Sequence, residues 1–151
     1  MIESDRFFEL FKKFNNFDKD NGLTFSVLSP GKITYKFEVL EKHLSSPDAC
    51  HGAVIAGFMD CVLGLAALSY AVTEGNLTST VEFKLNFIKP ARLGDKLIGN
   101  GHLEYKGKSL VIASGDIHRD SDKELIAKGL GTFNLYPMDK REDFMKNLDK
   151  A

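Results

Sequence analysis

The sequence has little of several features that would assign a function directly. Two cysteines among 151 residues, Cys50 and Cys61, are too few for a disulfide framework, which favours a reducing, cytoplasmic location. The formal net charge of −1 gives no electrostatic reason to expect nucleic acid or an anionic membrane as a partner. The opening MIESDRFFELF carries acids and no apolar stretch before a cleavage site, so no secretory signal is expected.

The sequence also lacks internal repeats, low-complexity tracts, a phosphate-binding loop signature and a domain linker. Hydrophobic residues make up 43% and charged residues 27%, which is typical of a soluble globular protein. We therefore expect a single domain over residues 1–151, long enough to bury a core of its own.

Only one long hydrophobic run is present, residues 53–73, in which Asp60 is the single charged residue. The run is nearly long enough to span a bilayer, but an acid near its middle costs roughly 2.5–3.5 kcal/mol on insertion scales. No second run of this kind exists, and the sequence after it is typical of a sheet. We expect a central helix buried in protein, with no membrane as partner.

The remaining patterns alternate between helix and strand. Apolar residues at helical spacing predict an amphipathic helix over residues 4–17, and alternation around Pro30-Gly31 predicts a hairpin. Four further alternating stretches follow between residues 79 and 136, and their short connections favour antiparallel pairing. Residues 138–151 are expected to form a polar C-terminal helix or a frayed tail. The fold class is α+β: a long central helix wrapped by a curled antiparallel sheet of five to six strands, with an extra N-terminal helix.

The central helix has one face of small residues and one of bulky residues. At 100° per residue, the small residues lie on the side of Asp60: Ala53, Ala56, Gly57, Gly64, Ala67 and Ala71. Glycine inside a helix costs about 1 kcal/mol relative to alanine, which either close packing at a dimer interface or room for a ligand would explain. Both explanations hold if the ligand site lies at the dimer interface. Asp60 itself fits either a structural hydrogen-bond network or a reactive site.

His51 and Gly52 precede Asp60 by about two helical turns. Backbone N–H groups at a helix start stabilise an oxyanion, and a carboxylate in an apolar cleft is a stronger base than one in water. Together the three residues favour hydrolytic chemistry.

The segment HGAVIAGFMDCVLGLAA resembles the signature of hotdog-fold acyl-CoA thioesterases of the phenylacetate-pathway (PaaI-like) type, in the 4-hydroxybenzoyl-CoA thioesterase superfamily. In that family the acid follows the histidine by nine residues, as Asp60 follows His51. The stretches STVEFKLNFIKPARLGDKL, YKGKSLVIASGDI and ELIAKGLGTF resemble later strands of the family, so the resemblance covers roughly residues 33–136.

The resemblance implies a hotdog fold that pairs as a homodimer, often a dimer of dimers (a homotetramer), with active sites at the dimer interface. It implies an acyl-CoA substrate, no metal and no cofactor. Asp60 would be the nucleophile or the base that activates water. The Gly52 amide of the other subunit would polarise the thioester carbonyl, with His51 positioning that carbonyl or holding the turn. Thr80 matches a hydroxyl position near the catalytic water.

Two positions depart from the family pattern. The family often has asparagine where Ser45 stands, and serine lacks the amide's paired donor and acceptor. Ala53 replaces the second glycine of the turn, which requires a negative φ at that residue. Ser45 is nevertheless a candidate catalytic residue at the asparagine position. The candidate substrate contacts are Ala53, the small residues beside the acid and four basic residues suited to CoA phosphates: Gly57, Gly64, Lys89, Arg92, Lys106 and Lys108.

Several alternatives stay open at this stage. Cys50 beside His51 could be a thiol nucleophile, although adjacent residues rarely orient productively and no third group is evident. A hotdog hydratase would place its histidine or acid where this chain has Leu65. A non-catalytic acyl-CoA-binding or sensor protein on the same scaffold is the second functional hypothesis, kept open by Ser45. His43, His102 and His118 are expected at the surface.

Overall fold

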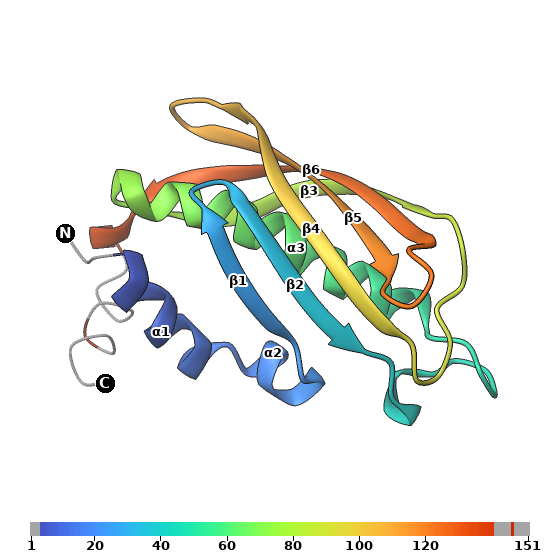
Figure 1. The fold of residues 1–151 in the computed structure, drawn as a ribbon. Helices are drawn as coiled ribbons and strands as arrows, with labels where there is room; N and C mark the ends of the chain where they lie inside the picture. Colours follow the sequence, from blue (N-terminus) through green and yellow to red (C-terminus); the bar gives the residue numbers. More distant parts are fainter. Residues whose placement is uncertain (1–3, 141–145, 147–151) are drawn as a thin grey trace.

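The computed structural model describes residues 4–140 and residue 146. Within them six strands form one antiparallel sheet in the order β1-β2-β4-β5-β6-β3 (Figure 1). Their bounds are β1 Thr24–Ser29, β2 Lys32–Glu38, β3 Asn76–Phe87, β4 Lys96–Lys106, β5 Leu110–Arg119 and β6 Leu125–Pro137. The hairpin predicted around Pro30-Gly31 is confirmed as β1–β2, and the strand count and pairing directions agree with the sequence patterns. β3 ends the sheet on one side and pairs only with β6.

The sheet curls around the central helix α3, Gly52–Ala71, which a 3₁₀ turn, η2 (Val72–Glu74), continues (Figure 1). By length and composition alone Gly52–Glu74 could cross a membrane. Its bulky residues instead fill the interior of the sheet, and this burial of apolar surface is what holds the helix in place. The fully or nearly fully buried residues include Ile55, Phe58, Met59, Val62, Leu63 and Leu65. The predicted central helix is therefore confirmed.

The helix approaches the sheet closely where strand β4 carries glycine. A Cβ atom added to Gly101 would lie 2.6 Å from the backbone oxygen of Val62, a distance that real Cβ atoms essentially never show. A side chain here would force α3 away from the sheet. Because Gly101 has no side chain, the backbones of β4 and α3 can come into contact.

The predicted N-terminal helix over 4–17 is divided in two. Helix α1 covers Ser4–Phe14, and a shorter helix α2 covers Asn16–Asn21. Asn15 separates them: its backbone leaves the helical region at ψ 85°, and its side chain accepts a hydrogen bond from the backbone N–H of Asp18, which caps α2. Competition of this kind from an asparagine side chain is the physical reason why the apolar periodicity continues while the helix does not.

The prediction that His43 lies at the surface is wrong. His43, in the short 3₁₀ helix η1 (Glu41–His43), is 2% exposed and packs against the Phe37 ring. Its Nδ1 atom accepts a hydrogen bond from the Leu40 N–H, and its Nε2 atom lies 3.1 Å from the Asn21 side-chain oxygen. Burial lowers the pKa of this imidazole. His102 and His118 lie on strands, paired with Glu104 and Asp116.

The polar tail expected over 138–151 begins with a 3₁₀ turn, η3 (Met138–Lys140). The rest of that prediction lies outside the described residues, apart from Lys146.

Candidate active site

Asp60 lies in the third turn of α3 and faces the edge strand β3. The Oγ1 atom of Thr80 donates a hydrogen bond of 3.0 Å to Asp60 Oδ1. The register of β3 against β6 shifts between Thr80 and Glu82, and such a bulge re-aims nearby side chains. The two residues predicted to act together are thus in contact, although they come from different elements.

Both residues line a cleft of about 260 Å³ between α1, α3 and β3. Apolar groups form most of its wall, with a few hydroxyl and amide groups. The lining residues are Phe11, Asn15, Tyr35, Asp60, Cys61, Gly64, Leu65, Leu68, Thr78, Ser79, Thr80 and Phe133. Asp60 is half-buried and Thr80 is exposed in the single chain. The carboxylate therefore has an apolar setting and remains open to an incoming molecule.

The deeply buried acid is a different residue, Asp18 of α2, which is 5% exposed. Tyr35 donates a hydrogen bond of 2.6 Å to Asp18 Oδ2, and the Cys61 thiol lies 3.8 Å from Oδ1. Burial raises the pKa of Asp18, against the opposing effect of the Tyr35 hydrogen bond. No sequence pattern points to this cluster, because Asp18 lies in the polar stretch NFDKDN, where an acid is expected in solvent.

The start of α3 is built around His51. Its Nδ1 atom accepts a hydrogen bond of 2.9 Å from the Ala53 N–H, and its carbonyl oxygen accepts from Val54 and Ile55. Among the described residues no acceptor contacts the remaining N–H of this first turn, that of Gly52. His51 therefore caps the helix and leaves free the one amide expected to bind a carbonyl oxygen. Ala53 has a negative φ, as its place in the turn requires.

Gly52 and Asp60 of one chain are eight residues apart on a straight helix. At 1.5 Å per residue they are separated by about 12 Å along the axis, more than one thioester carbonyl can bridge. A single chain thus brings Thr80 to Asp60 but does not bring Gly52 to it.

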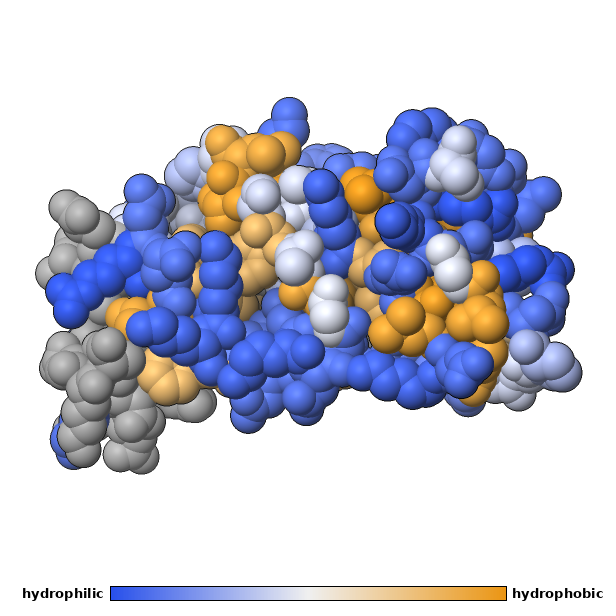
Figure 2. Space-filling view, turned by 60° about the horizontal axis from the view of Figure 1, so that its bottom comes forward, coloured by the Kyte–Doolittle hydropathy of each residue, from blue (hydrophilic) through white to orange (hydrophobic). Residues whose placement is uncertain are grey.

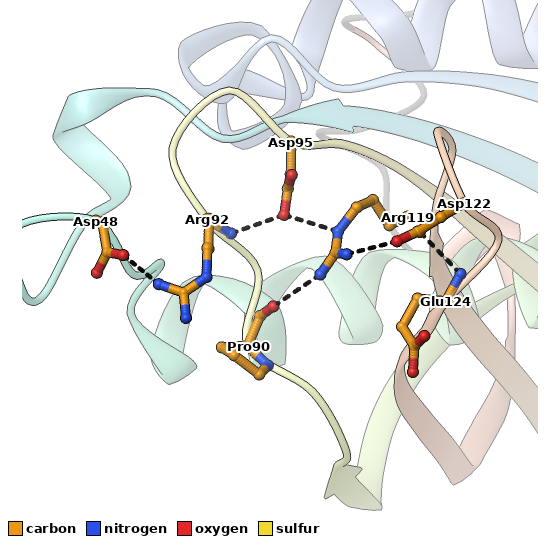
Figure 3. Close-up of polar contacts among 7 residues, drawn as sticks. All are labelled: Asp48, Pro90, Arg92, Asp95, Arg119, Asp122 and Glu124. Atoms are coloured by element: carbon orange, nitrogen blue, oxygen red, sulfur yellow. Dashed lines mark hydrogen bonds and ion pairs between the residues drawn. The ribbon is translucent and has the colours of Figure 1, made fainter.

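The loop before α3 is held by ionic and backbone contacts to the loop between β3 and β4 (Figure 3). Arg92 pairs with Asp48, while Asp95 accepts from the Arg92 backbone N–H and from the Arg119 side chain. Arg119 also contacts Asp122 and donates to the Pro90 carbonyl oxygen. The contacts fix the turn that presents His51 and Gly52.

The four basic residues suggested for CoA phosphates lie at opposite ends of α3. Lys89 pairs with Glu124 at 3.7 Å, and Arg92 pairs with Asp48 near the helix start. Lys106 lies over the Tyr70 ring, 4.6 Å from its centroid, near the helix end, and Lys108 shares a surface depression with it. The structure does not bring the two pairs together in one chain.

The other candidates occupy different places. Gly64 lines the cleft, whereas a Cβ atom on Gly57 would lie 3.1 Å from the Phe17 ring of α2. Close packing against Phe17 of the same chain therefore explains why residue 57 is a glycine. Ser45 is exposed in the loop before α3, where its backbone N–H donates to Ala49.

The surroundings of Cys50 do not support the thiol alternative, because its Sγ atom contacts, at 3.7 Å, the His51 carbonyl oxygen, which cannot act as a base. Cys50 is half-buried, and burial raises its pKa to about 11, which leaves the thiol protonated near neutral pH. Across residues 4–140 and 146, no group of three or more histidine, cysteine or acidic side chains is arranged to hold a metal ion.

Comparison with known proteins identifies the family of the chain. Residues 48–126 match the family described as the Thioesterase superfamily. Human acyl-coenzyme A thioesterase 13 is 28% identical over 124 residues, covering 82% of this chain and 87% of the human protein. The Escherichia coli PaaI protein from the phenylacetic acid degradation operon has a TM-score of 0.76 at 15% identity, covering 88% and 95% of the two chains. A Streptococcus mutans protein solved with acetyl CoA has a TM-score of 0.67 at 20% identity, covering 76% and 89%.

A long helix inside a curled six-stranded antiparallel sheet is the hotdog fold, as the sequence resemblance implied. With more than half of its length matched, the chain belongs to the thioesterase superfamily, and its enzyme class is thioester hydrolase.

Proposed function

We propose that this protein hydrolyses acyl-CoA thioesters to a free acid and CoA. The observation that carries the proposal is the Thr80–Asp60 hydrogen bond in a largely apolar cleft of a thioesterase-superfamily fold. The acyl-CoA name of the human relative and the acetyl CoA bound to the S. mutans protein support the choice of substrate. The reaction as proposed uses no metal and no redox cofactor.

In this mechanism Asp60 attacks the thioester carbonyl carbon or removes a proton from an attacking water. In either case a C–O bond forms, the C–S bond breaks, and the CoA sulfur leaves as a thiolate that takes up a proton. If water attacks, the free acid forms directly and the proton held by Asp60 passes to the thiolate. If Asp60 attacks, a water then hydrolyses the mixed anhydride to the free acid and restores the carboxylate. Thr80 orients the Asp60 carboxylate through its hydrogen bond. Negative charge develops on the carbonyl oxygen, where one positioned N–H donor is typically worth on the order of 10²–10³ in rate.

That donor is proposed to be the Gly52 amide of a second copy of the chain. Within one chain the amide lies about 12 Å along α3 from Asp60, too far for both to touch one carbonyl group. A dimer formed along β3 would suit this arrangement, because Thr80 lies on that edge of the sheet, and Val81 and Phe87 expose apolar side chains there. We infer a homodimer, or a dimer of dimers, as the active form.

The test is thiol release from a panel of acyl-CoAs by the wild-type protein and by Asp60→Asn. We expect turnover of at least one acyl-CoA and a loss of at least 10²-fold in kcat for the variant. Asp116→Asn, on strand β5 and outside this cleft, is the matched control and should keep wild-type activity. No thiol release from any acyl-CoA, or equal rates for wild type and Asp60→Asn, would contradict the proposal.

The second hypothesis, a non-catalytic acyl-CoA-binding protein, predicts a different result. Calorimetric titration would then show tight binding of an acyl-CoA without thiol release. Ser45, in place of an amide side chain, is the feature that favours this outcome.

A further inference from the structure

The cleft that holds Asp60 continues along α3 beyond the carboxylate. Gly64, Leu65 and Leu68 follow Asp60 on the cleft wall, so the cleft extends about 12 Å along the helix. Phe133 of β6 and residues 78–80 of β3 form one side. Phe11 of α1 and Asn15 form the other.

This second side, which we call the amino-terminal wall (Phe11 and Asn15), lies outside the segment that matches the thioesterase superfamily, residues 48–126. Figure 2 shows the molecule from the side on which α1 and α2 lie in Figure 1, with apolar patches between hydrophilic side chains. The family match therefore covers Asp60 but not Phe11 and Asn15, which line the same cleft.

The amino-terminal wall is fixed to the body of the protein. The Phe11 ring centroid lies 6.2 Å from that of Phe7 and 6.1 Å from that of Phe25. Asn15 caps α2, whose Asp18 accepts the buried hydrogen bond from Tyr35. The position of Phe11 is thus set by packing and hydrogen bonds, as a residue that discriminates between substrates requires.

The size and polarity of the cleft restrict its occupant. An enclosed apolar cavity of about 150 Å³ holds a benzene ring, so an open cleft of about 260 Å³ has room for one aromatic ring or for an alkyl chain of medium length. Leucine and phenylalanine side chains line its far part, which favours an apolar group over a charged one.

We propose that the acyl group of the substrate lies in this cleft and that Phe11 is a specificity-determining residue, which limits the acyl group to medium length or to a single aromatic ring. This inference rests on the proposed function, because it assumes an acyl thioester at Asp60. It goes further by assigning substrate selection to helix α1.

The experiment measures kcat/KM for straight-chain CoA esters from acetyl to palmitoyl, and for phenylacetyl-CoA, with wild type, Phe11→Ala and Phe11→Trp. Phe11→Ala removes the ring from the α1 side of the cleft and enlarges the space beside α3, so it should raise the palmitoyl-to-hexanoyl ratio of kcat/KM at least tenfold. Phe11→Trp should lower that ratio. The matched control is Phe14→Ala, which removes a 42% exposed ring of the same helix that does not line the cleft and should leave the ratio unchanged.

Circular dichroism establishes that each variant is folded, and Phe11→Leu replaces Phe11→Ala if the alanine variant unfolds. Wild-type turnover with the same chain-length profile in both Phe11 variants would overturn this inference alone. A shift of equal size in Phe14→Ala would also overturn it. Absence of thiol release from every ester would instead overturn the proposed function.

Discussion

The Oγ1 atom of Thr80 lies 3.0 Å from Oδ1 of Asp60 and joins the edge strand β3 to the central helix. The contact places a hydroxyl donor and a carboxylate at the margin of one chain, where a second chain could complete the site. It also gives Asp60 a fixed orientation, because a hydrogen bond to a charged group is stronger than one between neutral groups.

Removal of the Thr80 hydroxyl is expected to slow the reaction. Hydrogen bonds to charged groups contribute about 1.5–3 kcal/mol, so Thr80→Val should lower kcat roughly 10- to 100-fold, whereas Thr80→Ser should keep most of the activity. The measurement is steady-state thiol release. Thr132→Val, which removes a hydroxyl that donates to Glu82 on the same sheet, is the control and should keep the wild-type kcat. Equal activity of Thr80→Val and wild type would show that the contact does not orient the acid.

The ionic contacts in Figure 3 are expected to differ in their effect on stability. Arg119, whose side chain is 21% exposed, contacts Asp95, Asp122 and the Pro90 carbonyl, so Arg119→Met should lower the free energy of unfolding by about 1–3 kcal/mol. The side chain of Arg92 is 54% exposed, and its ion pair with Asp48 is solvent-exposed. Arg92→Met should therefore lower the free energy of unfolding by at most about 1 kcal/mol. Urea denaturation measures both. A larger loss for Arg92→Met would reverse this ranking.

His43 is expected to make stability depend on pH. Because burial lowers its pKa, the unfolded chain binds more protons than the folded protein as pH falls below the ordinary histidine value of about 6.5. The free energy of unfolding should therefore fall between pH 7.5 and 5.5, and protonation of Nδ1 would also break the hydrogen bond from Leu40.

The measurement for His43 is urea denaturation across this pH range. His43→Gln should show a smaller fall in stability than wild type, while His102→Gln, a change at an exposed histidine on β4, should show the wild-type fall. An equal fall in His43→Gln and wild type would mean that other groups cause the pH dependence.

Much of the fold could be predicted because its patterns are strong and local. The central helix is a long apolar run, and the strands alternate between turn residues. His43 and Asp18 were missed because both are buried polar residues, and only the full set of hydrogen-bond partners, Leu40, Asn21 and Tyr35, explains why they can be buried.

In the candidate site, too, some residues follow from local patterns and others depend on three-dimensional packing. Gly52 and Asp60 lie on one helix, which His51 caps, so spacing along the sequence related these three residues, and the resemblance added Thr80. Phe11 and Asn15 reach the cleft only through the docking of α1 and α2, which no local pattern encodes. Their position at the cleft can therefore be recognised only in the three-dimensional structure.

The order of strands in the sheet has a practical consequence for work with shortened forms of the protein. A fragment cut at residues 48 and 126 would lose β2, the neighbour of β4, and nearly all of β6, the neighbour of both β5 and β3. Of the three strands that remain, β4 and β5 would still pair with each other, whereas β3 would have no partner, and bare strand edges promote aggregation. A soluble catalytic fragment therefore needs both flanking segments, even though neither contributes to the family match.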